Sequence, residues 1–203
     1  MQIEEIALVI ERGGVVGIPT DTVYGLACDP LSSDALERVY AIKHRPAGLE
    51  LTLLAATRDD VEQAVMFNAA ARRLADRYWP GAVSIVASLR GRRYAIPRSG
   101  DTLSVRIPDH PLLADLLRRT GPLATTSANR HGGEPGRTAD DVRRALGHEV
   151  DAVLDGGPAG GRASSIIDCS RMPVRVLREG PIGERELLAA ARVPTSPSQR
   201  EEQ

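Results

Sequence analysis

Short apolar runs interleave with helical patterns along the whole chain, and this order limits the folds that it can adopt. Runs typical of strands lie at residues 15–18, 51–56, 83–89, 103–107, 122–129, 151–155, 164–170 and 174–180. Helical patterns lie at residues 3–12, 33–43, 59–66, 68–78, 110–121, 138–146 and 183–192. Because the two kinds do not alternate strictly, we predict a single α/β (or α+β) domain around a mixed sheet.

The chain has 203 residues, which is enough for one domain with a full core. We assign that domain to residues 1–192 and expect a disordered tail at 193–203, where Pro, Ser, Gln and charged residues leave little to bury. Aromatic residues make up only 3%, so the core must consist of Val, Ile, Leu and Ala. Stacking of several bases on aromatic side chains is therefore not expected.

Charge and cysteine content narrow the class of protein. The formal net charge is −1, so no global basic field attracts nucleic acid, and an anion site requires a local cluster. Cys28 and Cys169 have no metal-type spacing and are expected to be small buried residues of a reduced protein. An acidic N-terminus and the absence of a long apolar run predict a cytoplasmic protein with no membrane partner.

Two strand ends carry unusual polar clusters. Residues 19–26, PTDTVYGL, follow the first predicted strand and either cap a turn or hold a small polar ligand. Residues 124–129, ATTSAN, offer hydroxyls and backbone N–H groups that suit phosphate or ribose oxygens, although a Ser/Asn turn has the same composition. Thr138 and Asp141 form a capping-box pattern at the start of a later helix.

Lys43 is the single lysine among 26 Lys and Arg residues. It precedes Arg45 by two positions at a predicted helix end, where Pro46 bends the backbone. Two cations at a bend can bind one polyphosphate, or they can form a solvated basic terminus that complements the helix dipole. The spacing alone leaves both alternatives open.

Further charged and small residues lie in or between strands. Arg106 and Arg178 each interrupt an apolar run, where each can be solvated or can clamp a carboxylate bidentately. Four glycines within residues 155–168 favour a flexible connection but also permit close backbone approach to a ligand. The chain has no nucleophile elbow, no HExxH and no Cys–His arrangement. Many donors without an activated nucleophile indicate that bound substrates react with each other while the protein positions them and stabilises charge.

In this order, several segments resemble the YrdC/Sua5 family of L-threonylcarbamoyladenylate synthases, from about Ile6 to Ile182. The segments are PTDTVYGL, AIKHRP, LSVRIPDHP, TSAN, SSIID and LREGPI. The resemblance is to the short, YrdC-like form without an additional C-terminal domain. It implies a YrdC-like fold, a twisted open mixed sheet flanked by helices around a positively charged cavity.

The family's reaction follows as an expectation. L-threonine, bicarbonate or CO2 and ATP, with Mg2+, would give L-threonylcarbamoyl-AMP and pyrophosphate for the t6A modification of tRNA, and tRNA threonylcarbamoyl-transfer proteins would receive the product. By resemblance, threonine-binding residues are Thr22, Tyr24, Arg106, Thr125, Ser164 and, as a possible exchange partner, Ser165. The ATP-binding residues implied are Lys43, Arg45, Thr102, Ser127, Asn129 and Arg178. The Lys43 and Arg45 pair is implied to act in catalysis by neutralising phosphate charge.

Three positions depart from the family pattern. Leu49 and Leu54 replace a commonly polar residue and a possible threonine-side histidine, and Gly136 replaces an ATP-contacting serine. They predict a less polar threonine site and a less complete ATP site. The alternatives to a synthase are therefore a YrdC-like paralogue that binds nucleotide or RNA without synthase activity, and, with little weight, a carbamoyl-transfer module like that of hydrogenase maturation proteins.

Overall fold

The computed structural model describes residues 2–44, 51–91, 94–97, 100–130 and 132–192. Arg45, Leu49 and the predicted tail at 193–203 lie outside these residues. The helices are α1 (Ile3–Glu11), α2 (Ser33–Ile42), α3 (Arg58–Ala64), α4 (Ala69–Tyr78), α5 (Pro111–Thr120), α6 (Ala139–Leu146) and α7 (Glu184–Ala191), with a short 3₁₀ turn at Gly147–Glu149. The strands are β1 (Val16–Ile18), β2 (Gly25–Cys28), β3 (Thr52–Leu54), β4 (Val65–Met66), β5 (Val83–Leu89), β6 (Thr102–Arg106), β7 (Leu123–Ser127), β8 (Ala152–Val153), β9 (Ser165–Asp168) and β10 (Arg175–Arg178).

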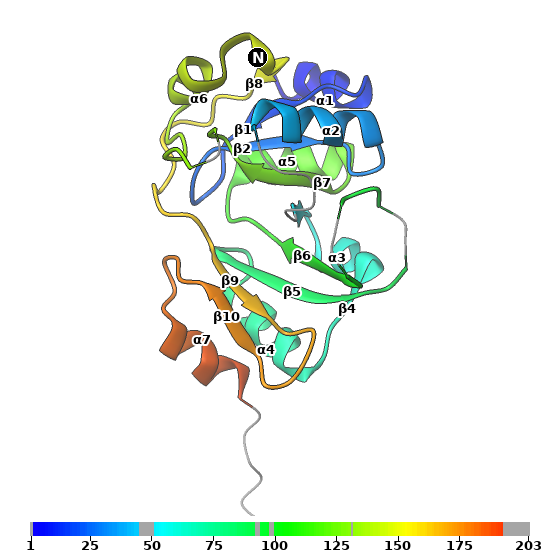
Figure 1. Cartoon of the computed structure of the whole chain (residues 1–203), viewed down its shortest axis with the longest axis vertical. Coiled ribbons are helices and arrows are strands. Elements are labelled where there is room, and N and C mark those ends of the chain that lie inside the picture. The colour runs from blue at the N-terminus through cyan, green and yellow to red at the C-terminus, as the bar shows by residue number, and fades with distance from the viewer. Residues whose placement is uncertain (1, 45–50, 92–93, 98–99, 131, 193–203) are drawn as a thin grey trace, which may run out of the picture.

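The strands of the described part form one sheet in the order β10-β9-β5-β6-β3-β7-β2-β1-β8, with β4 added on β5. The pairs β1–β8, β3–β6 and β5–β9 are parallel and the other pairs are antiparallel. The mixed sheet expected from the sequence is thus confirmed. The sheet twists along the length of the molecule, with α1 and α6 near one end and α4 and α7 near the other (Figure 1).

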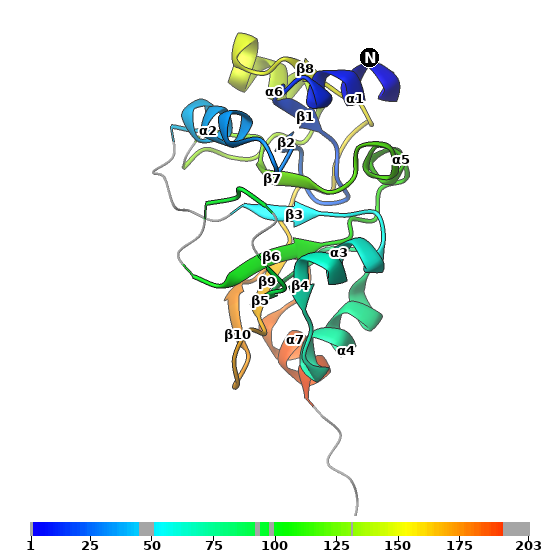
Figure 2. The same cartoon turned by 90° about the vertical axis from the view of Figure 1, so that its right-hand side faces the viewer.

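Helices cover the sheet from more than one side, with α2 and α5 on opposite sides of it (Figure 2). One apolar cluster joins α1 and α5 to β1 and includes Ile6, Ile10, Leu113 and Leu117. A larger cluster gathers the inner faces of α2, α3, α4, α6 and α7. Both consist mainly of Val, Ile, Leu and Ala, as the low aromatic content required.

Helix starts follow local capping chemistry. Ser32, Thr57 and Asn68 each accept a hydrogen bond from a backbone N–H in the first turn of the following helix. The predicted capping box is confirmed, because the Thr138 hydroxyl accepts from the Asp141 backbone N–H and the Asp141 carboxylate accepts from that of Thr138. These bonds satisfy N–H groups that a helix leaves without internal partners.

Two strands were not predicted. β2 was missed because Gly25–Cys28, GLAC, has neither alternation nor β-branched residues, and pairing with β1 and β7 decides its conformation. β4 was wrongly included in a helix over 59–66; the helix ends at Ala64, and Val65 and Met66 pair with the end of β5. No helix of the described residues combines the length and apolar character that a bilayer crossing requires.

The larger cluster predicts a stability effect. Leu74 on α4 is fully buried, so Leu74→Ala is expected to lower the free energy of unfolding by about 2–5 kcal/mol through lost burial and a residual cavity. Urea unfolding followed by circular dichroism measures this change. Leu177→Ala removes the same atoms from a side chain that is 55% exposed and should change stability by about 0.5 kcal/mol or less. Equal effects of the two variants would contradict this account of the core.

Candidate functional site

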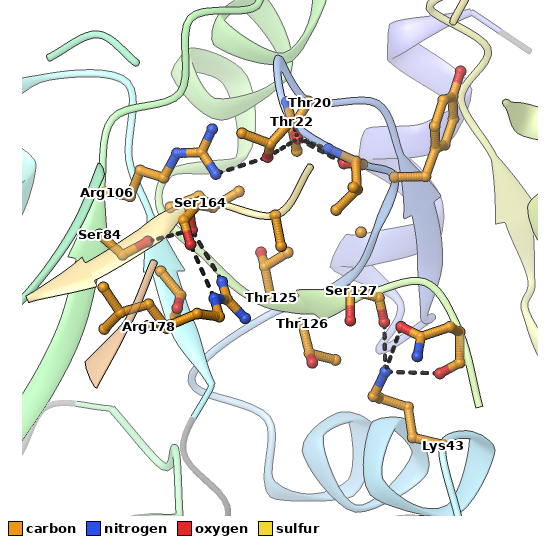
Figure 3. Close-up of a pocket in the computed structure, with 18 of the residues that line it drawn as sticks. Thr20, Thr22, Lys43, Ser84, Arg106, Thr125, Thr126, Ser127, Ser164 and Arg178 are labelled. Atoms are coloured by element: carbon orange, nitrogen blue, oxygen red, sulfur yellow. Dashed lines mark hydrogen bonds between the residues drawn. The ribbon is translucent and has the colours of Figure 1, made fainter. Parts of the chain in front are cut away.

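A pocket of about 280 Å³ opens on the sheet, beside the turn between β1 and β2. Side chains or backbone from β3, β5, β6, β7, β10 and the end of α2 contribute to its wall (Figure 3). Most residues that the family resemblance implied are brought together here although they are far apart in sequence. They are Thr22, Tyr24, Lys43, Arg106, Thr125, Ser127, Asn129, Ser164 and Arg178.

The turn at residues 20–24 is held by its own threonines. The Thr20 hydroxyl donates to the Val23 carbonyl oxygen at 2.6 Å and accepts from the backbone N–H groups of Thr22 and Val23, both at 3.1 Å. The hydroxyls of Thr20 and Thr22 lie 2.9 Å apart. The two alternatives for PTDTVYGL therefore both apply to parts of it, since Thr20 forms the turn and the turn places Thr22 in the pocket wall.

Arg106 is a buried cation at one end of the pocket. It is 5% exposed, which decides between the two alternatives that the sequence left for it. Its Nε donates to the Gly81 carbonyl oxygen at 2.8 Å, one Nη donates to the Thr22 hydroxyl at 3.0 Å, and the other to the Asp21 carboxylate at 2.5 Å. Burial lowers the pKa of Arg106, and the Asp21 carboxylate opposes that shift.

Arg178 reaches the same end of the pocket from β10 (Figure 3). Its Nε donates to the Ser164 carbonyl oxygen at 2.9 Å and its Nη2 to the Ser164 hydroxyl at 3.2 Å. The Ser164 hydroxyl also lies 2.9 Å from that of Ser84. Burial lowers the pKa of Arg178, and the charge of Arg106 lowers it further, which indicates that the two guanidinium groups share one electrostatic environment.

Lys43 lies at the other end of the pocket, next to Ser127 (Figure 3). Its Nζ donates to the carbonyl oxygens of Ser127 and Asn129 at 2.5 and 2.7 Å, and it lies 3.3 Å from the Asn129 side-chain oxygen. Only 3% of the residue is exposed. The solvated helix terminus considered from the sequence is therefore wrong for Lys43, and its charge instead acts on the strand end at Ser127–Asn129.

The glycine-rich segment after β8 packs against the turn rather than forming a loose connection. The Tyr24 hydroxyl donates to the Gly157 carbonyl oxygen at 2.9 Å and accepts from the Gly156 N–H at 3.1 Å. A Cβ on Gly160 would lie 2.7 Å from the Asp21 carbonyl oxygen, so a side chain there would displace the turn. Tyr24 thus lines the pocket while its hydroxyl anchors this segment, and burial raises the pKa of that hydroxyl.

Ser164 and Ser165 have different roles. The Ser165 hydroxyl donates to the Ile182 carbonyl oxygen at 2.6 Å and accepts from the N–H groups of Gly180 and Ile182 at 3.0 and 3.2 Å. Ser165 is absent from the described pocket wall, and Ser164 is present in it. An exchange of roles between the two serines is therefore not what this geometry supports, because the Ser165 hydroxyl fastens the loop after β10.

The remaining positions divide as follows. Thr102 pairs with Ser88 at the start of β6 and does not contribute to the described pocket wall, and Arg45 lies outside the described residues. Of the departures from the family pattern, Leu54 lines the pocket, whereas Gly136 lies behind it, with its carbonyl oxygen accepting from the Tyr24 N–H at 2.9 Å.

Sequence reasoning assigned no role to several residues that the fold brings to the site. Asp21 contacts Arg106, and Ser84 and Thr52 line the pocket. The available signal was weak: Ser84 and Thr52 are single hydroxyl residues within apolar strands, and Asp21 lies inside a motif whose threonines drew attention first.

Comparison with known proteins adds an independent finding. A sequence model of the Sua5, YciO and YrdC proteins, described as "Telomere recombination", matches residues 8–180. A threonylcarbamoyl-AMP synthase of Stutzerimonas stutzeri is 36% identical over 170 residues, which covers 82% of this chain and 91% of that protein.

Solved structures agree with the sequence comparison. The crystal structure of P. abyssi Sua5 complexed with L-threonine aligns with a TM-score of 0.87 at 30% identity and covers 93% of this chain. The chain spans only 56% of the length of that Sua5. The E. coli YciO structure aligns with a TM-score of 0.82 at 26% identity and covers 92% of each chain.

The two serines of β9 predict a stability difference. Ser165→Ala leaves the buried N–H and carbonyl groups of Gly180 and Ile182 without their hydroxyl partner, so it should lower the free energy of unfolding by about 1–3 kcal/mol. Ser33→Ala, at an exposed position of α2, serves as the control and should change it by about 0.5 kcal/mol or less. Chemical denaturation measures both; a neutral Ser165→Ala would contradict the fastening role.

Proposed function

The chain belongs to the Sua5/YciO/YrdC family, and we propose that it is a threonylcarbamoyl-AMP synthase. In this proposal L-threonine, bicarbonate or CO2 and ATP combine to give threonylcarbamoyl-AMP and pyrophosphate. The product then serves tRNA threonylcarbamoyl-transfer proteins in t6A synthesis.

The observation that carries this proposal is the buried guanidinium of Arg106 in the pocket wall. Of its five N–H groups, three donate to Gly81, Thr22 and Asp21, which leaves two for a ligand. Two N–H groups of one guanidinium suit the two oxygens of a carboxylate, and such charge-assisted pairs are strong. Arg106 is therefore the proposed partner of the threonine carboxylate, with Thr22, Thr125 and Ser164 around the amino acid.

The opposite end of the pocket is the proposed phosphate end. Lys43, Ser127 and Asn129 gather there, and the resemblance adds Arg45 and Thr102. In the described geometry the Lys43 ammonium donates to backbone carbonyl oxygens. It supports phosphate binding through its positive field, and direct contact requires exchange of one of these bonds.

The chemistry follows from this arrangement. The threonine nitrogen captures CO2, and an oxygen of the resulting carbamate attacks the α-phosphorus of ATP while the bond to pyrophosphate breaks. The protein provides no nucleophile; it holds the reactants in contact and stabilises the developing charge. The hydroxyl and cation character of the pocket wall fits this task.

Mg2+ is proposed to arrive with ATP. Within the described residues no group of three His, Cys, Asp or Glu side chains could hold a metal ion. Mg2+ commonly keeps several waters and binds substrate phosphates, which fits a wall of hydroxyls and cations. When bound it would neutralise phosphate charge.

Product formation tests the proposal directly. Pyrophosphate release from ATP is expected to require both threonine and bicarbonate, and mass spectrometry should detect threonylcarbamoyl-AMP. Omission of either reactant should reduce release to background, provided that dissolved CO2 is removed. ATP breakdown that proceeds without threonine would instead favour the paralogue alternative.

The carboxylate partner has its own test. Arg106→Lys keeps the charge but loses the planar pair of donors, so the KM for threonine should rise at least about tenfold, with a smaller change in the KM for ATP. Steady-state kinetics measure the two constants. Arg118→Lys, on an exposed part of α5, is the matched control and should leave both unchanged. An unaltered KM for threonine in folded Arg106→Lys would rule out this contact.

A further inference from the structure

The charges at the Arg106 end of the pocket exceed what an amino acid zwitterion needs. Arg106 and Arg178 both line the wall there, and no Asp or Glu is among the described lining residues. Asp21 pairs with Arg106 and does not itself line the pocket. An ammonium group placed between these two guanidinium groups would be repelled, whereas a second anionic group would be attracted.

Arg178 has N–H groups to spare. Two of its five donate to Ser164, one to the carbonyl oxygen and one to the hydroxyl. The Ser164 hydroxyl in turn is 2.9 Å from the Ser84 hydroxyl, and both serines are buried in the wall. Arg178, Ser164 and Ser84 therefore form a preorganised donor group next to Arg106 (Figure 3). We call this group the second anion subsite.

The position of Arg178 differs from the role that the family resemblance implied. That resemblance placed it with the ATP-binding residues, yet it is hydrogen-bonded to Ser164, a threonine-side residue, and lies away from Lys43 and Ser127 (Figure 3). The lowering of the Arg178 pKa by the charge of Arg106 agrees with this grouping.

We propose that this end of the pocket binds the amino acid as its N-carboxylate, a dianion, with the α-carboxylate on Arg106 and the N-carboxylate on the second anion subsite. The proposal rests on the proposed synthase function and deepens it. It assigns bicarbonate, or the CO2 derived from it, to Arg178, Ser164 and Ser84, and it predicts that the N-carboxylate forms before ATP is bound.

The chemical step balances without a further reactant. Zwitterionic threonine and bicarbonate give the N-carboxylate, one water and one proton, which passes to solvent. A C–N bond forms, a C–O bond of bicarbonate breaks, and the net charge of −1 is conserved. Because the product carries two carboxylates, the Arg106–Arg178 pair stabilises it more than the zwitterion, and the equilibrium at the site shifts toward it.

Calorimetric titration of the full chain with threonine, without ATP, tests the proposal. Bicarbonate is expected to raise the affinity for threonine at least about fivefold relative to chloride at equal ionic strength and pH. With ¹³C-bicarbonate, a carbamate carbon resonance should appear only when protein and threonine are both present. An unchanged affinity together with no such resonance would overturn the proposal.

A stable mimic separates binding from chemistry. In 2-(1-hydroxyethyl)succinate two atoms join the carboxyl carbons, as in N-carboxythreonine, but a carbon replaces the nitrogen. It should compete with threonine, and bicarbonate should not strengthen its binding. Failure of the mimic to bind, or a bicarbonate effect equal to that seen with threonine, would contradict the two-subsite arrangement.

Variants locate the effect. In Arg178→Gln the ratio of threonine affinities with and without bicarbonate should fall to about one, and Arg178→Lys should recover part of it. Arg175→Gln, at an exposed position of the same strand, should keep the wild-type ratio. Thermal unfolding confirms that each variant is folded, and a full bicarbonate effect in folded Arg178→Gln would exclude Arg178.

The two proposals fail separately. Pyrophosphate release that depends on threonine and bicarbonate, without any bicarbonate effect on threonine binding, would retain the synthase and reject the second anion subsite. A bicarbonate effect and a carbamate resonance without pyrophosphate release on addition of ATP would retain the subsite and reject the synthase.

Discussion

The buried guanidinium of Arg106 is the constraint on which the site depends. Removing such a group from water costs several kcal/mol unless its N–H groups find partners. Gly81, Thr22 and Asp21 supply three acceptors from two separate loops. The turn at residues 20–24 therefore has to lie against the end of β6, and the pocket exists because this contact fixes one of its walls.

Close backbone packing maintains the same arrangement from behind. The segment around Gly156–Gly161 lies on the turn, with the Tyr24 hydroxyl between its N–H and carbonyl groups and with no space for a Cβ at Gly160. A similar contact occurs at Gly180, where a Cβ would lie 2.3 Å from the Ala163 carbonyl oxygen. These glycines are required by proximity between segments, and together they place Ser164 and Arg178 beside Arg106.

The pocket thereby separates two kinds of positive charge. Arg106 and Arg178 present planar groups with unused N–H donors, which suit carboxylates. Lys43 presents a compact ammonium that backbone carbonyl oxygens surround, and its effect on a ligand is mainly that of its field. One chain of near-neutral net charge can in this way hold several anionic reactants, because the cations are gathered locally and their charge is only partly compensated.

The sequence by itself determined the class of fold, most of the helices and strands, and the residue types of the site. Apolar periodicity and capping residues are local properties, which is why α6 and its capping box could be predicted and why β2, whose conformation depends on two neighbouring strands, could not. The resemblance of ordered motifs identified Arg106 and Ser164 among the site residues. Only the tertiary structure decided that Arg106 is buried with Asp21, that Ser165 fastens a loop and that Arg178 stands beside Ser164. Those decisions depend on contacts between segments up to about a hundred residues apart, and no local pattern in the chain encodes the distances between them.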